Sequence, residues 1–197
     1  MRDPDLAIAL PSSYAIVFLE FKGSKSMNFL LIVAQMIPAV VMSLGFYQIY
    51  DDIGLLDSIP GLIVADSTLS VPFAVILMTG FMSVCHARWW RQRKSTEHHS
   101  GVFTKIVIPL SRNTVVTTSL FAFLWAWSDF MFASTLDSGG GKMRPITMGL
   151  YDFIGSQNQE WGPMMATAVL ASVPTALLLI FAQKYVAAGV TAGAVKD

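Results

Sequence analysis

Four long apolar stretches constrain this chain more than any other feature of its sequence. They run approximately from Met27 to Tyr50, from Ile59 to Val84, from Ile106 to Phe132 and from Met164 to Val186. Each is long enough to cross the hydrocarbon core of a bilayer as a helix, which takes about 20 mostly apolar residues. A helix satisfies its backbone hydrogen bonds internally, as the absence of water there demands. We therefore predict an all-α, polytopic membrane helix bundle.

A fifth apolar stretch, from about Leu6 to Phe21, is shorter and begins close to the first residue. It lacks the basic flank and the small-residue cleavage site of a signal peptide. We interpret it as a span whose beginning is missing, so the bundle is expected to have about five spans.

Composition and charge exclude several classes of protein. Only 13% of the residues are charged, against about 25% in a typical soluble domain. The 13 basic and 13 acidic residues balance, which argues against a nucleic-acid-binding face. A single cysteine, Cys85, excludes an internal disulfide, and the irregular spacing of His86, His98 and His99 makes poor metal geometry. We predict no metal and no cofactor.

The connecting segments alternate in charge, which predicts the orientation because Lys and Arg favour the cytoplasmic side. Ten basic residues fall on one side: Lys22, Lys25, Arg88, Arg91, Arg93, Lys94, Lys105, Arg112, Lys184 and Lys196. Three fall on the other side: Arg2, Lys142 and Arg144. This difference predicts an external N-terminus and a cytoplasmic C-terminus.

Each long stretch also contains a proline, namely Pro38, Pro72, Pro109 or Pro174. A proline inside a membrane helix is tolerated where neighbouring helices or polar side chains satisfy the carbonyl groups that it frees. The prolines therefore favour a packed bundle over isolated membrane anchors.

Four residues are candidates for lining a transport pathway. Asp66 lies within a predicted span, where a charge is costly unless it faces protein, water or a partner. Trp125, Trp127 and Asp129 lie near the outer end of another, where the aromatic rings either anchor the helix at the interface or stack on a sugar. A position of Asp66 near the outer end of its helix is the alternative to a pathway role.

Three passages of the second half share a pattern with a known family: GVFTKIVIPL at Gly101 to Leu110, WAWSDFMF at Trp125 to Phe132 and QKYVAAGVTAGAVKD at Gln183 to Asp197. They resemble the membrane subunits of binding-protein-dependent ABC importers, in the carbohydrate branch that includes the smaller membrane subunit of the maltose transporter. Ser128 replaces the usual Asn of the Trp-Asn-Asp-Phe passage. Weaker similarity extends back to about Leu6.

The resemblance implies a multi-pass subunit of the bacterial plasma (inner) membrane without a catalytic site of its own. Its expected partners are a second membrane subunit, a pair of cytoplasmic ATPases and an extracytoplasmic sugar-binding protein. Because the family core has six spans, residues 1–197 are interpreted as one transmembrane domain that is incomplete at its N-terminus.

The family's cytoplasmic ATPase-coupling loop corresponds to residues 85–105. By the resemblance, Gly101, Phe103, Ile106 and Pro109 belong to its closing part. The expected Glu-Ala-Ala and Asp-Gly are absent from CHARWWRQRKSTEHHS, which occupies residues 85–100. If the written sequence is real, its bulky and basic residues should prevent coupling, which leaves a non-functional remnant of a permease as an alternative.

A secondary, ion-coupled carrier is a second alternative, although no internal repeat or set of ion ligands is visible. A membrane-embedded enzyme is a third, but the chain has no paired-histidine motif or nucleophile-and-base set. The sequence does not identify the sugar.

We hypothesise that residues 85–100 record a pair of compensating frame errors. Back-translation with G or C mostly at the third base, read two bases later, gives Pro-Arg-Glu-Val-Val-Glu-Ala-Ala-Gln-Val-Asp-Gly-Ala-Ser-Leu-Gly. Resequencing the genomic DNA from upstream of Met1 through the codon for Gly101 is expected to reveal this loop and a longer frame. An unshifted reading would refute the hypothesis.

Overall fold

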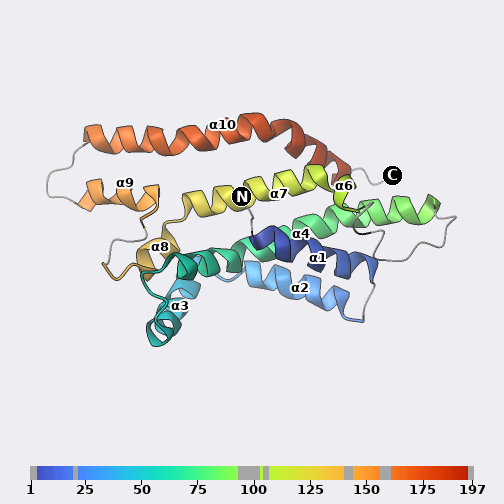
Figure 1. Cartoon of the computed structure of the whole chain (residues 1–197), viewed down its shortest axis with the longest axis horizontal. Helices are drawn as coiled ribbons and strands as arrows, with labels where there is room; N and C mark the ends of the chain where they lie inside the picture. Colours follow the sequence, from blue (N-terminus) through green and yellow to red (C-terminus); the bar gives the residue numbers. More distant parts are fainter. Residues whose placement is uncertain are drawn as a thin grey trace. The chain divides into compact units, whose positions relative to one another are not determined.

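The computed structural model describes residues 4–19, 22–92, 103, 107–139, 144–155 and 161–194, and every regular element in this part of the chain is a helix (Figure 1). The helices are α1 (Pro4–Phe18), α2 (Ser24–Gln35), α3 (Ala39–Ile53), α4 (Ile59–Gln92), α6 (Ile108–Leu110), α7 (Arg112–Ser128), α8 (Met131–Leu136), α9 (Ile146–Gly155) and α10 (Trp161–Ala194). The predicted all-α class is confirmed.

The long apolar stretches coincide with these helices. Two segments, Ile59–Val84 of α4 and Trp161–Gln183 of α10, are long and apolar enough to cross a membrane. The pair α2 and α3 qualifies as a third if the two are counted as one broken span. Helix α1 is apolar but shorter, and the stretch from Ile106 to Phe132 contains α6 and α7. The count of five spans therefore remains a prediction.

The prolines occupy two kinds of position. Pro38 precedes the first residue of α3, and Pro109 lies in the first turn of α6. A helix needs no backbone N–H at its first turn, so these two prolines begin helices without cost. Pro11, Pro72 and Pro174 lie inside α1, α4 and α10, where each removes a backbone hydrogen bond.

Hydroxyl side chains are largely satisfied by carbonyl groups of their own helices. The Ser13 hydroxyl donates to the Ala9 carbonyl at 2.7 Å, and the Ser83 hydroxyl donates to the Thr79 carbonyl at 2.8 Å. The same bond recurs at Thr117 and at Ser172. This pattern lets an apolar helix carry Ser and Thr without exposing an unpaired donor to lipid.

The chain divides into two compact units, which are described separately. Unit 1 comprises Met1–Gln35, Ser70–Ala122 and Phe181–Asp197, and unit 2 comprises Met36–Leu69 and Phe123–Ile180. In unit 1, α1 packs against α4 through Ala9, Ile16 and Met78, which are buried. The Ser70 hydroxyl of α4 donates to the Asp5 carboxylate of α1 at 2.6 Å. This bond adds a polar connection to an otherwise apolar contact.

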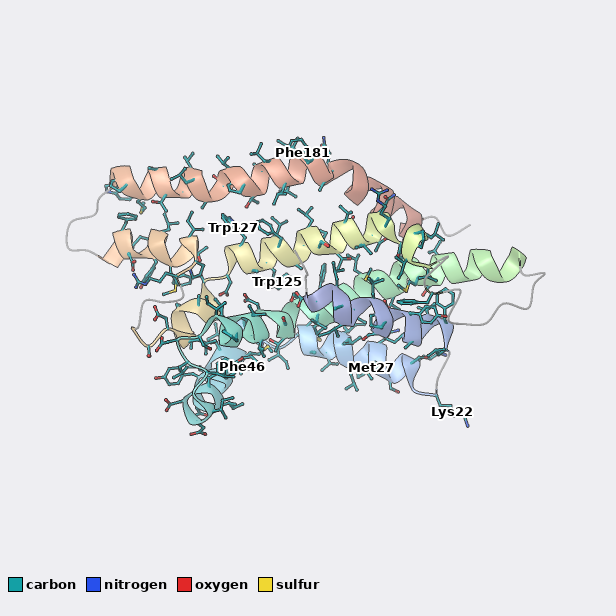
Figure 2. The ribbon with its side chains drawn as sticks, in the orientation of Figure 1. Lys22, Met27, Phe46, Trp125, Trp127 and Phe181 are labelled. Carbon is teal, nitrogen blue, oxygen red and sulfur yellow. The ribbon has the colours of Figure 1, made fainter. Side chains whose placement is uncertain are left out.

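Unit 2 is built around the contact of α3 with the short helix α8. Phe132 of α8 is 1% exposed and packs with Tyr50 of α3 and Leu69 of α4. Its ring meets that of Phe46 at a centroid distance of 5.9 Å and an interplanar angle of 73°, and Figure 2 labels Phe46 in α3. Such an edge-to-face pair adds about 0.5–1.5 kcal/mol beyond the burial itself.

The α3–α4 turn in unit 2 is fixed by side chains as well as by backbone. Gly54 ends α3 in the left-handed conformation, with φ of 70°. Asp57 also has a positive φ of 53°, which Asp tolerates better than most residues. Its carboxylate accepts hydrogen bonds from the Ser138 N–H at 2.7 Å and from the Ser138 hydroxyl. The turn is thereby tied to the segment that follows α8.

Between Trp161 and Gln183, helix α10 presents exposed apolar side chains. None of the most hydropathic 18-residue window in Trp161–Gln183 is buried. Leu170 is 66% exposed and Phe181 71% exposed, and Figure 2 labels Phe181 on this helix. A surface this apolar on a long helix suits a bilayer or another membrane helix and not water.

The α3–α4 turn leaves no room for a side chain at Gly61, which generates a prediction for Gly61→Ala. A Cβ at this position would lie 2.5 Å from the Leu55 carbonyl oxygen, which is backbone and cannot step aside. The Gly61 carbonyl also accepts from the Tyr50 hydroxyl at 3.0 Å. We expect thermal unfolding in detergent to show a loss of about 1–3 kcal/mol.

Gly162→Ala is the matched control, because a Cβ at Gly162 meets nothing within 4 Å. Equal stability of the two variants would contradict this description of the turn.

Candidate functional site

The four pathway candidates, Asp66, Trp125, Trp127 and Asp129, all belong to unit 2. Asp66 lies on α4 with a partly buried side chain, directly after Ala65 of the unit 2 core. Trp125 lies on α7 and is 37% exposed. Trp127 and Asp129 lie at the end of α7, where the structure brings them together with three other helices of unit 2.

Trp127 connects α7 to α10. Its indole N–H donates to the Ala171 carbonyl at 3.0 Å, and Figure 2 shows Trp127 in α7. Ala171 lies three residues before Pro174 and directly after Leu170, whose carbonyl loses its intrahelical donor to the proline. The ring also stacks on Phe123 one turn earlier, with a centroid distance of 5.5 Å. Trp127 therefore joins α7 to α10 one residue away from the carbonyl that Pro174 leaves without its usual donor.

Asp129 caps α8. Its two carboxylate oxygens accept hydrogen bonds from the Phe132 N–H at 3.2 Å and the Ala133 N–H at 2.9 Å. These are backbone donors that the first turn of a helix leaves without an intrahelical acceptor. The Asp129 carbonyl also accepts a hydrogen bond from the Thr147 hydroxyl of α9. The Asp129 carboxylate is thus already committed to the backbone.

Phe103 and Pro109, two of the four residues predicted to couple to an ATPase, belong to unit 1. The Phe103 ring meets the Tyr14 ring of α1 at 4.8 Å and packs against Met82 of α4 and Val107. Pro109 is exposed in the first turn of α6. Gly101 and Ile106 lie outside the described residues. In this passage Phe103 and Val107 therefore pack onto α1 and α4, whereas Pro109 does not.

The backbone of residues 85–92 continues α4, so the first part of the predicted coupling loop is helical. Residues 93–102 and 104–106 lie outside the described part of the chain, and the assignment of 85–105 as a coupling loop remains a prediction. Among the residues that the structure describes, no group of three or more His, Cys, Asp or Glu is placed to hold a metal ion.

Sequence reasoning missed the ion pairs of unit 2 and three buried hydroxyl groups of unit 1. Arg144 pairs with Asp152 at 2.7 Å and with Asp137 at 3.7 Å in unit 2.

In unit 1, three threonine Oγ1 atoms are buried without a hydrogen-bond partner, at Thr79 of α4 and at Thr114 and Thr118 of α7. An unpaired buried hydroxyl costs about 1–3 kcal/mol, so these three retain capacity to bond a solute or water. Only the i, i+4 spacing of Thr114 and Thr118 is visible in the sequence.

Comparison with known proteins places these features in a family. Residues 7–192 match the model of the binding-protein-dependent transport system inner membrane component. The osmoprotective compounds uptake permease protein GgtD of Synechocystis sp. is 24% identical over 98% of this chain and 65% of its own length. The chain therefore spans about two thirds of that relative.

Two further relatives are named for sugars. The diacetylchitobiose uptake system permease protein DasC of Streptomyces coelicolor is 27% identical over 97% of this chain and 69% of its own length. The trehalose transport system permease protein SugB of Mycobacterium tuberculosis is 27% identical over 94% of this chain and 68% of its own length. Since the family model matches nearly all of the described helices, the chain belongs to the membrane permease subunits of binding-protein-dependent ABC importers.

Proposed function

We propose that this chain is a transmembrane subunit of an ATP-driven carbohydrate importer, forming part of the pathway for the sugar. The observation that carries the proposal is the family match over residues 7–192, joined to relatives that are named for the uptake of diacetylchitobiose and trehalose. ATP hydrolysis is expected in a separate ATPase pair. A second membrane subunit and an extracytoplasmic sugar-binding protein complete the importer.

Coupling would pass through Phe103. Its ring contacts Tyr14, and it packs with Met82 and Val107 in one apolar cluster of unit 1. The Ser111 N–H donates to the Val107 carbonyl at 2.9 Å, which joins the cluster to the start of α7. A close-packed cluster transmits displacement because its side chains have no free space to absorb it. A movement of the loop by the ATPase would therefore be carried to α1, α4 and α7.

Asp66 and Trp125 remain the pathway candidates on unit 2. Asp66 is a carboxylate within the apolar span Ile59–Val84, and Trp125 presents an exposed aromatic surface. A carboxylate accepts hydrogen bonds from sugar hydroxyls, and an indole face packs against the apolar face of a pyranose ring. These two chemistries together suit a neutral carbohydrate.

The first test is uptake of radiolabelled trehalose and diacetylchitobiose into proteoliposomes that hold the complete importer. We expect uptake to require ATP and to continue without an ion gradient. Phe103→Ala is expected to lower the maximal uptake rate and the sugar-stimulated ATPase rate together, by about two- to thirtyfold, because coupling contacts are lost. The sugar concentration at half-maximal rate should not change.

Phe29→Ala is the control in the same unit, since Phe29 of α2 is 65% exposed. It should behave as the wild type. Uptake driven by a proton or sodium gradient in the absence of ATP would instead favour a secondary carrier. Full uptake and full ATPase stimulation by Phe103→Ala would contradict the coupling role.

Membrane orientation generates a separate prediction. We expect an external position for Asp52 at the end of α3 and a cytoplasmic position for Lys25 at the start of α2, because basic residues favour the cytoplasm. Both side chains are exposed. In a Cys85→Ser background, a membrane-impermeant maleimide should label Asp52→Cys in intact cells and Lys25→Cys only after permeabilisation. The reverse labelling would invert the topology.

A further inference from the structure

The segment Trp127 to Phe130 makes contacts with three other helices of unit 2. The Trp127 indole N–H donates to the Ala171 carbonyl of α10. The Asp129 carboxylate accepts from the backbone N–H groups of the first turn of α8. The Asp129 carbonyl accepts from the Thr147 hydroxyl of α9, and the Phe130 ring lies 5.2 Å from the Tyr151 ring of α9. We call this set of contacts the α7 joint.

Helix α8 depends on contacts outside itself. It has six residues, and a helix this short is not stable alone in water because nucleation is unfavourable. Asp129 fixes its first turn, and the Leu136 carbonyl at its last residue accepts from the Asp57 N–H at 3.2 Å. The Thr135 hydroxyl donates to the Ser43 hydroxyl of α3 at 3.3 Å. The position of α8 is therefore set by its neighbours, and one of these is Asp129, which directly follows α7.

The departure from the family's passage at Ser128 leaves the joint intact. The Ser128 hydroxyl donates to the Leu124 carbonyl of its own helix at 2.6 Å, and the residue is exposed. Its side chain therefore takes no part in the contacts to α8, α9 or α10 that are made by Trp127 and Asp129.

We propose that Trp127 and Asp129 are positioning residues for transport, which fasten α8, α9 and the Pro174 turn of α10 to the end of α7. In this role neither residue touches the sugar. The indole N–H of Trp127 donates to a backbone carbonyl, and both carboxylate oxygens of Asp129 accept from backbone N–H groups. The proposal rests on the proposed function, since it concerns transport by this subunit.

Conservative and non-conservative substitutions separate positioning from sugar contact at Asp129. Asparagine keeps one oxygen that can accept from one of the two backbone N–H groups, whereas alanine has no acceptor. Asp129→Asn should therefore lower the uptake rate less than Asp129→Ala does, by about twofold against a fall on the order of tenfold. The sugar concentration at half-maximal uptake should stay unchanged in both. Loss of uptake in Asp129→Asn would contradict the positioning role. A higher sugar concentration at half-maximal uptake in either variant would also contradict it.

Trp127→Phe makes the corresponding test at the other residue. It keeps an aromatic ring but removes the N–H that bonds to Ala171, so the maximal rate should fall on the order of tenfold without a change in half-saturation. If the ring stacks on sugar, Trp127→Phe should instead retain most of the rate. Trp161→Phe is the matched control, because Trp161 is 60% exposed at the start of α10.

Two measurements on the purified importer need no transport. Ultraviolet resonance Raman should show a hydrogen-bonded indole that disappears in Trp127→Phe and persists in Trp161→Phe. Thermal unfolding should show a lower midpoint for Asp129→Ala than for Asp129→Asn. An unchanged indole signature or equal midpoints would overturn the joint. Absence of ATP-driven uptake by the wild type would overturn the proposed function. The Raman and unfolding measurements would still test the contacts of the α7 joint.

Discussion

The need to satisfy every backbone carbonyl and N–H without water is the constraint on which this structure depends. A membrane helix meets it internally, except where a proline removes a donor. Pro38 and Pro109 avoid the cost by beginning helices, but Pro174 lies inside α10. There the Trp127 indole donates to a carbonyl of the disturbed turn. A side chain from a different helix thus adds a hydrogen bond next to the place where the proline removes one.

The same constraint explains why the polar side chains of this chain lie where they do. The hydroxyl groups of Ser13, Ser83 and Ser172 donate to backbone carbonyls of their own helices. They therefore need no donor or acceptor from another helix. Asp129 and Asp57 serve backbone N–H groups at the ends of short or irregular segments. These five polar side chains therefore bond to the backbone, unlike the buried hydroxyls of Thr79, Thr114 and Thr118.

The sequence predicted the positions of the long helices better than it predicted the contacts between them. The predicted stretch Ile59 to Val84 coincides with a qualifying span, because apolar length alone identifies it. Pro174 frees the Leu170 carbonyl, so the prediction that neighbouring helices satisfy carbonyl groups freed by prolines stays a prediction. The Trp127 indole donates to the next carbonyl along α10. The partner, Ala171, lies 44 residues from Trp127, and no periodicity connects positions so far apart. The sequence passage identified Trp127 and Asp129 as candidates. It did not predict that their side chains bond to backbone groups of α10 and α8.

By itself, the sequence determined the all-α class, the approximate places of the long helices and the membership in a permease family. These properties depend on local composition and on motifs that are contiguous in the chain. Only the tertiary structure decided that Phe103 packs on α1 and α4 and that Asp129 caps α8. It also decided that the α7 joint gathers α8, α9 and α10. Such contacts are set by how helices pack in three dimensions, which depends on side-chain shapes from distant segments at once.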